Sequence, residues 1–155
     1  MARSILIAVD GSTESRQATE VGLELAADRG ASVTFLHVDP AIAEALYELD
    51  PVHGPSQEQI LDADPVLAEA AALARAKGVA ARVEVAGSSR ERPSLSEIAD
   101  AIVGIAEGLE AGLIVLGSRG HGLLENVLLG SVSSGVLERS TVPVVVVRPG
   151  RSAGR

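Results

Sequence analysis

The residues best suited to chemistry lie in one stretch, where Gly117-Ser118-Arg119-Gly120 is followed, nine residues later, by Gly130-Ser131. The stretch follows an apolar run and leads into a helical pattern, which predicts a turn from a strand into a helix. At such a junction in a parallel sheet, main-chain N–H groups face a crevice, and glycine lets an anion approach them. The first turn of the helix adds unpaired N–H groups and a positive dipole end. We therefore predict a phosphate site with few charged side chains.

Other phosphate-binding and catalytic motifs are missing. A Walker loop needs a lysine after its second glycine, but the only lysine is Lys77, which follows Ala76. The dinucleotide fingerprint Gly-x-Gly-x-x-Gly would stand in the first strand-to-helix turn, at residues 10–14, and is absent there. The nucleophile elbow Gly-x-Ser-x-Gly does not occur, and the three histidines show no spacing typical of a metal site or a triad. We predict no catalytic residue and no metal site.

The composition indicates a single domain with an aliphatic core. The chain has 155 residues, enough to bury about two-thirds of the surface of its unfolded state. Hydrophobic residues make up 46%, yet Phe35 and Tyr47 are the only aromatic ones, which disfavours base stacking on aromatic side chains. The lack of cysteine excludes disulfides and thiolate sites. Without a signal-peptide pattern or an 18-residue apolar run, we expect a cytoplasmic protein that does not cross a membrane.

The net charge of −8 is unevenly distributed. Residues 1–70 hold 13 acidic and 3 basic residues, whereas residues 71–155 hold 8 acidic and 10 basic ones, and the glycine motif lies in this less acidic half. An acidic protein repels a nucleic-acid backbone, while a small anion needs only a local positive potential. We therefore expect no nucleic-acid partner.

Apolar strand-like runs alternate with amphipathic helical patterns along the chain. Strands are expected near residues 3–9, 32–38, 79–86, 113–116 and 142–148, with four helices between them. This alternation predicts an α/β fold with a doubly wound, five-stranded parallel sheet and helices on both faces. Residues 79–86 alternate between apolar and polar, which is typical of an edge strand.

The pattern fails between Asp39 and Asp64. Prolines and acidic residues surround one possible short helix, Ile42 to Leu49. A long irregular connection is usually functional or disordered. Both a flap over the site and a surface insertion remain open, because no residue there specifies a ligand contact.

The spacing of Gly117, Gly120, Gly130 and Ser131 resembles the nucleotide-binding signature of the universal stress protein family. The match extends to residues 5–12, which resemble the first strand of the family, and to residues 142–148, which resemble its last. It covers nearly the whole chain and is weakest between residues 40 and 64. The resemblance implies one domain over residues 1–150 with a polar tail at 151–155. It also implies the strand order 3-2-1-4-5 of the adenine nucleotide alpha-hydrolase-like fold.

The same resemblance implies a site for an adenine nucleotide. The main chain of Val38 would face the base, and Asp10 would lie beside Gly117 where the winding of the sheet reverses. The base and ribose would contact Ala8, Val9, Asp10 and Val38, and the ribose and phosphates would contact Leu116, Gly117, Arg119, Gly120, Gly130, Ser131, Val132 and Ser133.

Three of these residues have simpler interpretations. Asp10 could cap the helix after the first strand, but its place beside Gly117 favours ligand binding. Ser131 could likewise be only a helix cap, and the family spacing of the glycines favours nucleotide contact. Arg119 either reaches a phosphate or solvates its loop, and the residues alone leave both open.

We expect a protein that binds an adenine nucleotide, ATP in the first place, and acts as a ligand-dependent switch or scaffold in a stress response. AMP, ADP or a cyclic nucleotide is an alternative ligand, and Mg²⁺ could accompany the nucleotide. A slow Mg-dependent ATPase or phosphotransferase is an alternative function, disfavoured because Arg119 is the only cation that the motif offers. A dimerisation module that binds no ligand is a third possible function. The valine-rich strand from Val142 to Arg148 favours a homodimer, which the resemblance also implies.

Overall fold

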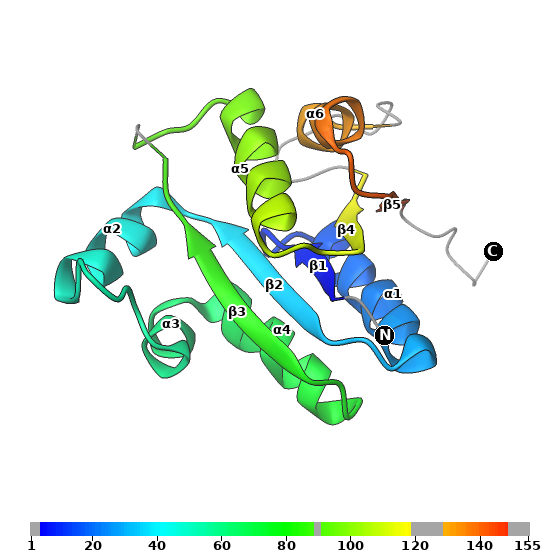
Figure 1. The fold of residues 1–155 in the computed structure, drawn as a ribbon, viewed down its shortest axis with the longest axis horizontal. Helices are drawn as coiled ribbons and strands as arrows, with labels where there is room; N and C mark the ends of the chain where they lie inside the picture. The colour runs from blue at the N-terminus through cyan, green and yellow to red at the C-terminus, as the bar shows by residue number, and fades with distance from the viewer. Residues whose placement is uncertain (1–3, 89–90, 119–128, 149–155) are drawn as a thin grey trace.

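The computed structural model describes residues 4–88, 91–118 and 129–148, which form an α/β fold around one parallel sheet (Figure 1). The strand order is β3-β2-β1-β4-β5, which confirms the predicted fold class and order. The strands are β1 (Ile5–Ala8), β2 (Val33–Val38), β3 (Ala81–Ala86), β4 (Leu113–Gly117) and β5 (Val144–Val147). The helices are α1 (Thr13–Arg29), α2 (Pro40–Leu49), α3 (Gln57–Ala63), α4 (Pro65–Ala76), α5 (Leu95–Gly108) and α6 (Ser131–Arg139).

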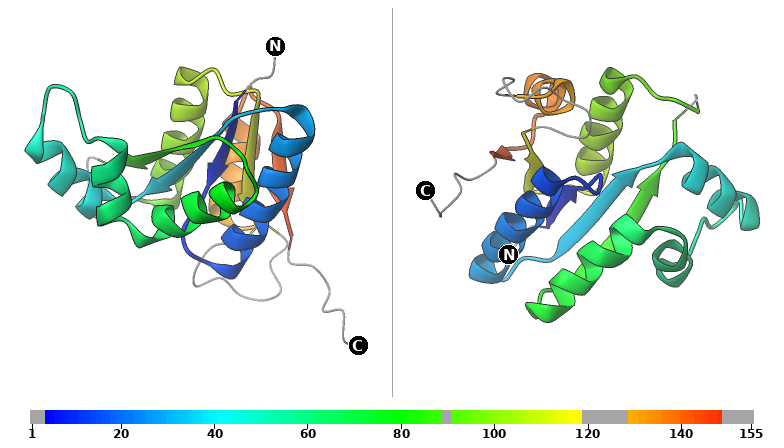
Figure 2. Two further views of the ribbon diagram at one scale, coloured as in Figure 1. Left: turned by 90° about the horizontal axis from the view of Figure 1, so that it is seen from below. Right: turned by 180° about the vertical axis from the view of Figure 1, so that it is seen from behind.

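Helices cover both faces of the sheet, with α1 and α4 on one face and α5 and α6 on the other (Figure 2). Side chains alternate between the two faces, so Phe35 of β2 packs on the α1 and α4 side while its neighbour Leu36 packs on the α5 and α6 side. Both side chains are fully buried. The strands of a parallel sheet buried on both faces read as continuous apolar runs, which is why β1 and β4 were readable from the sequence.

The winding reverses between β1 and β4. After β1 the chain proceeds to β2 and β3 on one side, and then crosses back to β4 and β5 on the other. Ile5 and Ile7 of β1 pair with Leu113 and Val115 of β4, so the two strands end side by side. Their carboxyl ends therefore flank the crevice in which sheets of this kind bind ligands.

Helix α1 packs close to the sheet at Gly22. A Cβ atom at this position would collide with Cδ1 of Ile7 and would lie 3.7 Å from Cβ of Val115. Ser12 is the N-cap of the helix, and its hydroxyl accepts the N–H of Ser15 at 3.1 Å. This contact caps the first turn of α1.

The segment from 39 to 64 contains two helices, α2 and α3, so the expectation of one short helix in an otherwise irregular connection is wrong. Helix α2 includes Pro40 at its first turn, where a missing N–H costs no hydrogen bond. Helix α3 begins with a capping box in which Ser56 and Gln59 satisfy each other's main-chain N–H groups. Ala43 and Leu46 of α2 and Ile60 of α3 are buried in the core. The segment is thus a packed part of the fold.

Helix α3 also covers the free edge of β3, which the strand order confirms as an edge. The side-chain amide of Gln57 donates to the carbonyl of Val83 at 3.0 Å and accepts the N–H of Val83 at 2.8 Å. This amide takes the place of a neighbouring strand at that position, which protects an otherwise unpaired edge.

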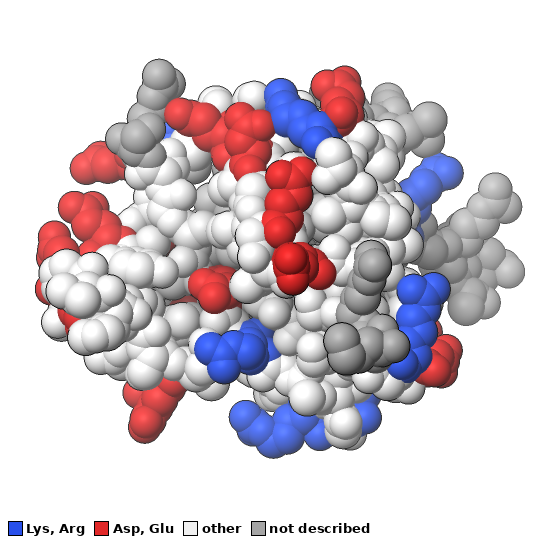
Figure 3. All heavy atoms as spheres, viewed as in Figure 1, with Lys and Arg blue, Asp and Glu red and all other residues white. Residues whose placement is uncertain are grey.

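Charged side chains of both signs are interspersed on the face shown in Figure 3, and its described residues form no extended basic area. None of the helices in the described part of the chain has the length and apolar character needed to cross a membrane.

Candidate functional site

A pocket of about 450 Å³ lies at the carboxyl ends of β1, β2 and β4, beneath the first turns of α5 and α6. It stands at the reversal of the winding, where ligands of doubly wound sheets bind. The described residues that line it are Ala8, Val9, Asp10, Ser15, Leu36, His37, Val38, Leu95, Ile98, Ile102, Leu116, Gly117, Ser118, Gly130, Ser131, Val132 and Ser133.

The pocket brings together most of the residues predicted from the sequence. Those lining it are Ala8, Val9, Asp10, Val38, Leu116, Gly117, Gly130, Ser131, Val132 and Ser133. Arg119 and Gly120 lie outside the described residues. The two ends of the sequence motif, Gly117 and Gly130, are therefore neighbours in space, as are the ends of β1 and β4.

Several lining residues were not predicted, and three of them come from α5. These are Leu95, Ile98 and Ile102, which follow one another at helical spacing. Only Ile102 is a fully buried core residue, while Leu95 is 48% exposed at the pocket mouth. The apolar stripe of a helix does not reveal which of its turns extends past the sheet, so the sequence carried no signal for this wall.

Asp10 lies at the end of β1 and does not cap α1, since Ser12 occupies that position. One carboxylate oxygen of Asp10 accepts the N–H of Ser12 at 2.9 Å, and the N–H of Asp10 donates to the hydroxyl of Ser15 at 3.1 Å. These bonds hold the carboxylate at the pocket wall. The interpretation of Asp10 as a simple helix cap is therefore wrong.

The start of α6 forms the opposite wall. Gly130 is the N-cap, with φ −75° and ψ 170°, and makes no side-chain hydrogen bond to the first turn. Ser131 is therefore not the cap, and its side chain is exposed. The hydroxyl of Ser133 is buried and donates to the carbonyl of Ser118 at 2.7 Å. The first turn of α6 thus presents main-chain N–H groups and the positive end of the helix dipole to the pocket.

Val38 closes the side of the pocket formed by β2. In this parallel sheet the N–H and C=O groups of successive residues point to alternate neighbours, and the carbonyl of Leu36 accepts the N–H of Val9 at 2.8 Å. The main-chain groups of Val38 point the same way, beyond the end of β1. Val38 itself lines the pocket.

Gly117 has a packing role that does not depend on any ligand. A Cβ atom there would lie 2.9 Å from Cβ of Glu14 and 3.0 Å from its carbonyl carbon. A side chain at this position would push the first turn of α1 away from β4. The presence of Gly117 is therefore also compatible with a scaffold that binds no ligand.

The described walls of the pocket carry little positive charge. Among the described lining residues there is no lysine or arginine, Asp10 is the one carboxylate, and His37 is the one imidazole. In this part of the pocket, the groups that favour an anion are the main-chain N–H groups and the dipole of α6. The described part of the chain also contains no group of three or more His, Cys, Asp or Glu residues able to hold a metal ion.

A pair of side chains, the partly buried His37 and the fully buried Asp64, supports the β2 wall from behind. Nδ1 of His37 lies 2.7 Å from Oδ2 of Asp64, and Oδ1 of Asp64 accepts the N–H groups of Val66 and Leu67 at the start of α4. Burial alone raises the pKa of Asp64, but the interactions with His37 and with these two N–H groups outweigh it and leave the pKa below its ordinary value. The pair fixes the end of β2 against α4.

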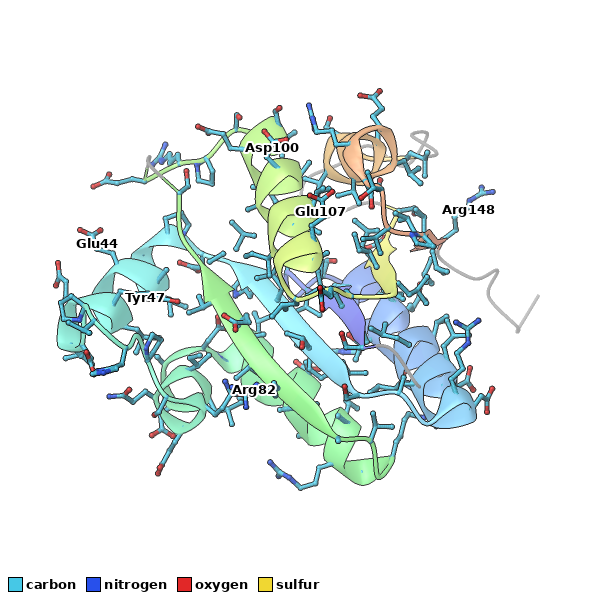
Figure 4. All side chains as sticks on the ribbon, viewed as in Figure 1. Glu44, Tyr47, Arg82, Asp100, Glu107 and Arg148 are labelled. Carbon is cyan, nitrogen blue, oxygen red and sulfur yellow. The ribbon has the colours of Figure 1, made fainter. Side chains whose placement is uncertain are left out.

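A second set of contacts holds together the two helices above the pocket. Nε of Arg139 on α6 lies 3.2 Å from Oδ1 of Asp100 on α5, and the same guanidinium donates to the hydroxyl of Ser96 at 2.9 Å (Figure 4). About two turns further along α5, the hydroxyl of Thr141, which follows α6, donates to Glu107 at 3.0 Å. These contacts tie the last turn of α6 and the chain just after it to α5.

The family model described as "Universal stress protein family" matches residues 1–148. A universal stress protein from Thermus aquaticus is 35% identical over 151 residues, which cover 96% of this chain and all of that protein. One from Mycolicibacterium smegmatis is 34% identical over 94% of this chain, which spans 45% of the length of that longer relative.

Solved structures show the same fold. A universal stress protein in complex with cAMP has a TM-score of 0.67 at 23% identity, covering 95% of this chain and 97% of that one. The universal stress protein from Archaeoglobus fulgidus in complex with dAMP has a TM-score of 0.63 at 21% identity, covering 95% and 98%.

Proposed function

Because the chain belongs to the universal stress protein family, we propose that it binds an adenine nucleotide, ATP in the first place, and acts in the cytoplasm as a ligand-dependent switch or scaffold in a stress response. The ligand site is the pocket at the ends of β1, β2 and β4. One observation carries the proposal. The same pocket contains the uncapped N-terminus of α6, the apolar wall of α5 and the main-chain edge of β2 at Val38.

The two halves of the pocket suit the two halves of a nucleotide. On one side, α6 begins at a glycine without a capping side chain, which leaves its first N–H groups available to phosphate. On the other, Val38 turns main-chain groups beyond β1, while Ile98 and Ile102 supply apolar contact for a base. Asp10 lies between these sides, in reach of ribose hydroxyls. The related proteins solved with dAMP and cAMP support an adenine nucleotide.

A switch or scaffold suits the pocket better than an efficient phosphotransferase. Phosphoryl transfer depends on cations placed around the transferred group, and none of the described lining residues is a lysine or an arginine. If Mg²⁺ accompanies a triphosphate, Asp10 is the one carboxylate at hand in the described part of the pocket. Steady ATP turnover that is lost in Asp10→Ala, with binding retained, would instead favour a slow ATPase.

Calorimetry on nucleotide-free protein tests the proposal. ATP, ADP, AMP and cAMP are titrated separately, with GTP as the control for the base, and any nucleotide released from the purified protein on denaturation is identified. A ligand at about 100 times its Kd adds about 2.7 kcal/mol of apparent stability, which a thermal shift detects. No released nucleotide and no binding of any adenine nucleotide would refute the proposal.

A further inference from the structure

Ser118 extends β4 by one residue and points its side chain toward the pocket. Its N–H donates to the carbonyl of Val147 at 2.8 Å, which continues the pairing of β4 with β5 beyond Gly117. A side chain at Gly117 would meet Glu14 of α1, on the opposite face of the sheet. Since successive residues of a strand alternate, Ser118 faces the side of α5 and α6, as Leu116 does. Both residues line the pocket.

The hydroxyl is the one polar group of Ser118 without a partner. Its N–H is paired with β5, and its carbonyl accepts both the N–H of Gly130 and the hydroxyl of Ser133. The residue is only 1% exposed, and its Oγ makes no hydrogen bond within the described part of the chain. A buried hydroxyl left unpaired costs free energy, so such a group in a native fold needs an explanation.

We propose that the Ser118 hydroxyl donates a hydrogen bond to a phosphate oxygen of the bound nucleotide, an inference that rests on the proposed function. Ser118 touches the first turn of α6 through Gly130 and Ser133. Val38, at the base side, belongs to β2, which β1 separates from β4. The hydroxyl therefore meets the phosphate and not the base. A neutral hydrogen-bond donor contributes more to phosphate binding where cationic side chains are few, and no described side chain of the pocket is a lysine or an arginine.

The two serines on either side of this contact have different roles. The hydroxyl of Ser133 already donates to the carbonyl of Ser118 and so fixes α6 to the end of β4. The hydroxyl of Ser118 is free for the ligand. Loss of the first weakens the apo fold, whereas loss of the second weakens only the complex.

The experiment compares wild type with Ser118→Ala by calorimetry against two probes, AMP and adenosine, and by thermal unfolding without ligand. The AMP affinity should fall about tenfold, as expected for a hydrogen bond to a charged group, while the adenosine affinity should change less than about twofold. The unfolding temperature of the apo protein should stay level or rise, because an unpaired buried hydroxyl has been removed.

Ser140→Ala is the matched control, since its hydroxyl is bonded to the main chain of Val142 in both directions, at 2.6 and 2.9 Å. It should lower the apo unfolding temperature and leave the AMP-to-adenosine affinity ratio unchanged. If wild type binds neither probe, the proposed function fails and this inference with it. If wild type binds both and Ser118→Ala keeps its AMP affinity, loses both affinities equally, or unfolds at a lower temperature, the inference alone is overturned.

Discussion

At the scale of single residues, the free energy of unfolding depends on the ionisation of the Asp64 carboxylate. Burial acts to raise its pKa, but His37 and the N–H groups of Leu67 and Val66 together lower it below its ordinary value. A carboxyl group whose pKa is lower in the folded than in the unfolded protein stabilises the fold above the unfolded pKa. That contribution is lost as the pH falls through the folded pKa.

Asp64→Asn should therefore lower the free energy of unfolding by about 1–3 kcal/mol at about pH 5.5, through the loss of charged hydrogen bonds at a fully buried site. Urea unfolding of both proteins should show the difference shrinking as the pH is lowered below about 4, where the unfolded carboxyl protonates. Asp50→Asn is the control, because the hydrogen bonds of Asp50 to His53 are exposed. This variant should lose less free energy of unfolding than Asp64→Asn. A difference independent of pH would contradict the role assigned to the charge.

Gly130 offers a direct test of the pocket at the same scale. Its φ of −75° is open to any residue, so Gly130→Val does not strain the backbone of the apo protein. The new side chain would project at the start of α6, where phosphate must approach. We expect AMP and ATP binding by calorimetry to be abolished while circular dichroism shows an unchanged fold. Unaltered affinity in the folded variant would show that Gly130 does not contact the ligand.

At the scale of elements, the strongly periodic segments could be predicted and the weakly periodic ones could not. The unbroken apolar run of β4 and the capping box of α5 at Ser94 and Glu97 are visible in the sequence, and both elements are present. Helix α3 has only seven residues and lies among prolines, so it gives no periodic pattern. Its capping box, Ser56 and Gln59, was nevertheless a readable indication of a helix start.

Contacts between elements far apart in the sequence leave no pattern to read. Gln57 and Val83 are 26 residues apart, and nothing in either segment indicates that an amide side chain would pair with a strand edge. The unpaired hydroxyl of Ser118 was hidden in the same way, although the residue stands inside the motif that predicted the site. Strand order came from family resemblance, since alternation alone fixes parallel pairing but not the sequence of neighbours.

The contact of α3 with β3 gives a prediction at this scale. Gln57→Met keeps the side-chain length but removes both hydrogen bonds to Val83, so the free energy of unfolding should fall by about 1–3 kcal/mol in urea titrations. The freed edge should also increase aggregation on storage, measured by light scattering. Glu58→Ala, at the exposed neighbouring position, should change neither quantity. Equal behaviour of the two variants would contradict the edge-covering role of Gln57.

At the scale of the whole molecule, the two edges of the sheet differ. The edge of β3 is covered by α3 through Gln57. At the other edge, all four valines of β5 are half-buried, and Arg148, just beyond them, is exposed at the end of the strand (Figure 4). No described helix pairs with the outer edge of β5, so that edge is the one placed to join another chain.

We expect this edge to pair with its own copy across a two-fold axis, since one self-complementary strand closes a dimer with a single interface. Light scattering at micromolar concentration should then give twice the chain mass of 15.8 kDa. Val145→Lys places a charge in the middle of β5 and should lower the mass to that of one chain. Ala81→Lys, at an exposed position of the covered edge, should leave the dimer intact. A wild-type monomer, or a dimer lost equally in both variants, would show that assembly does not depend on the β5 edge.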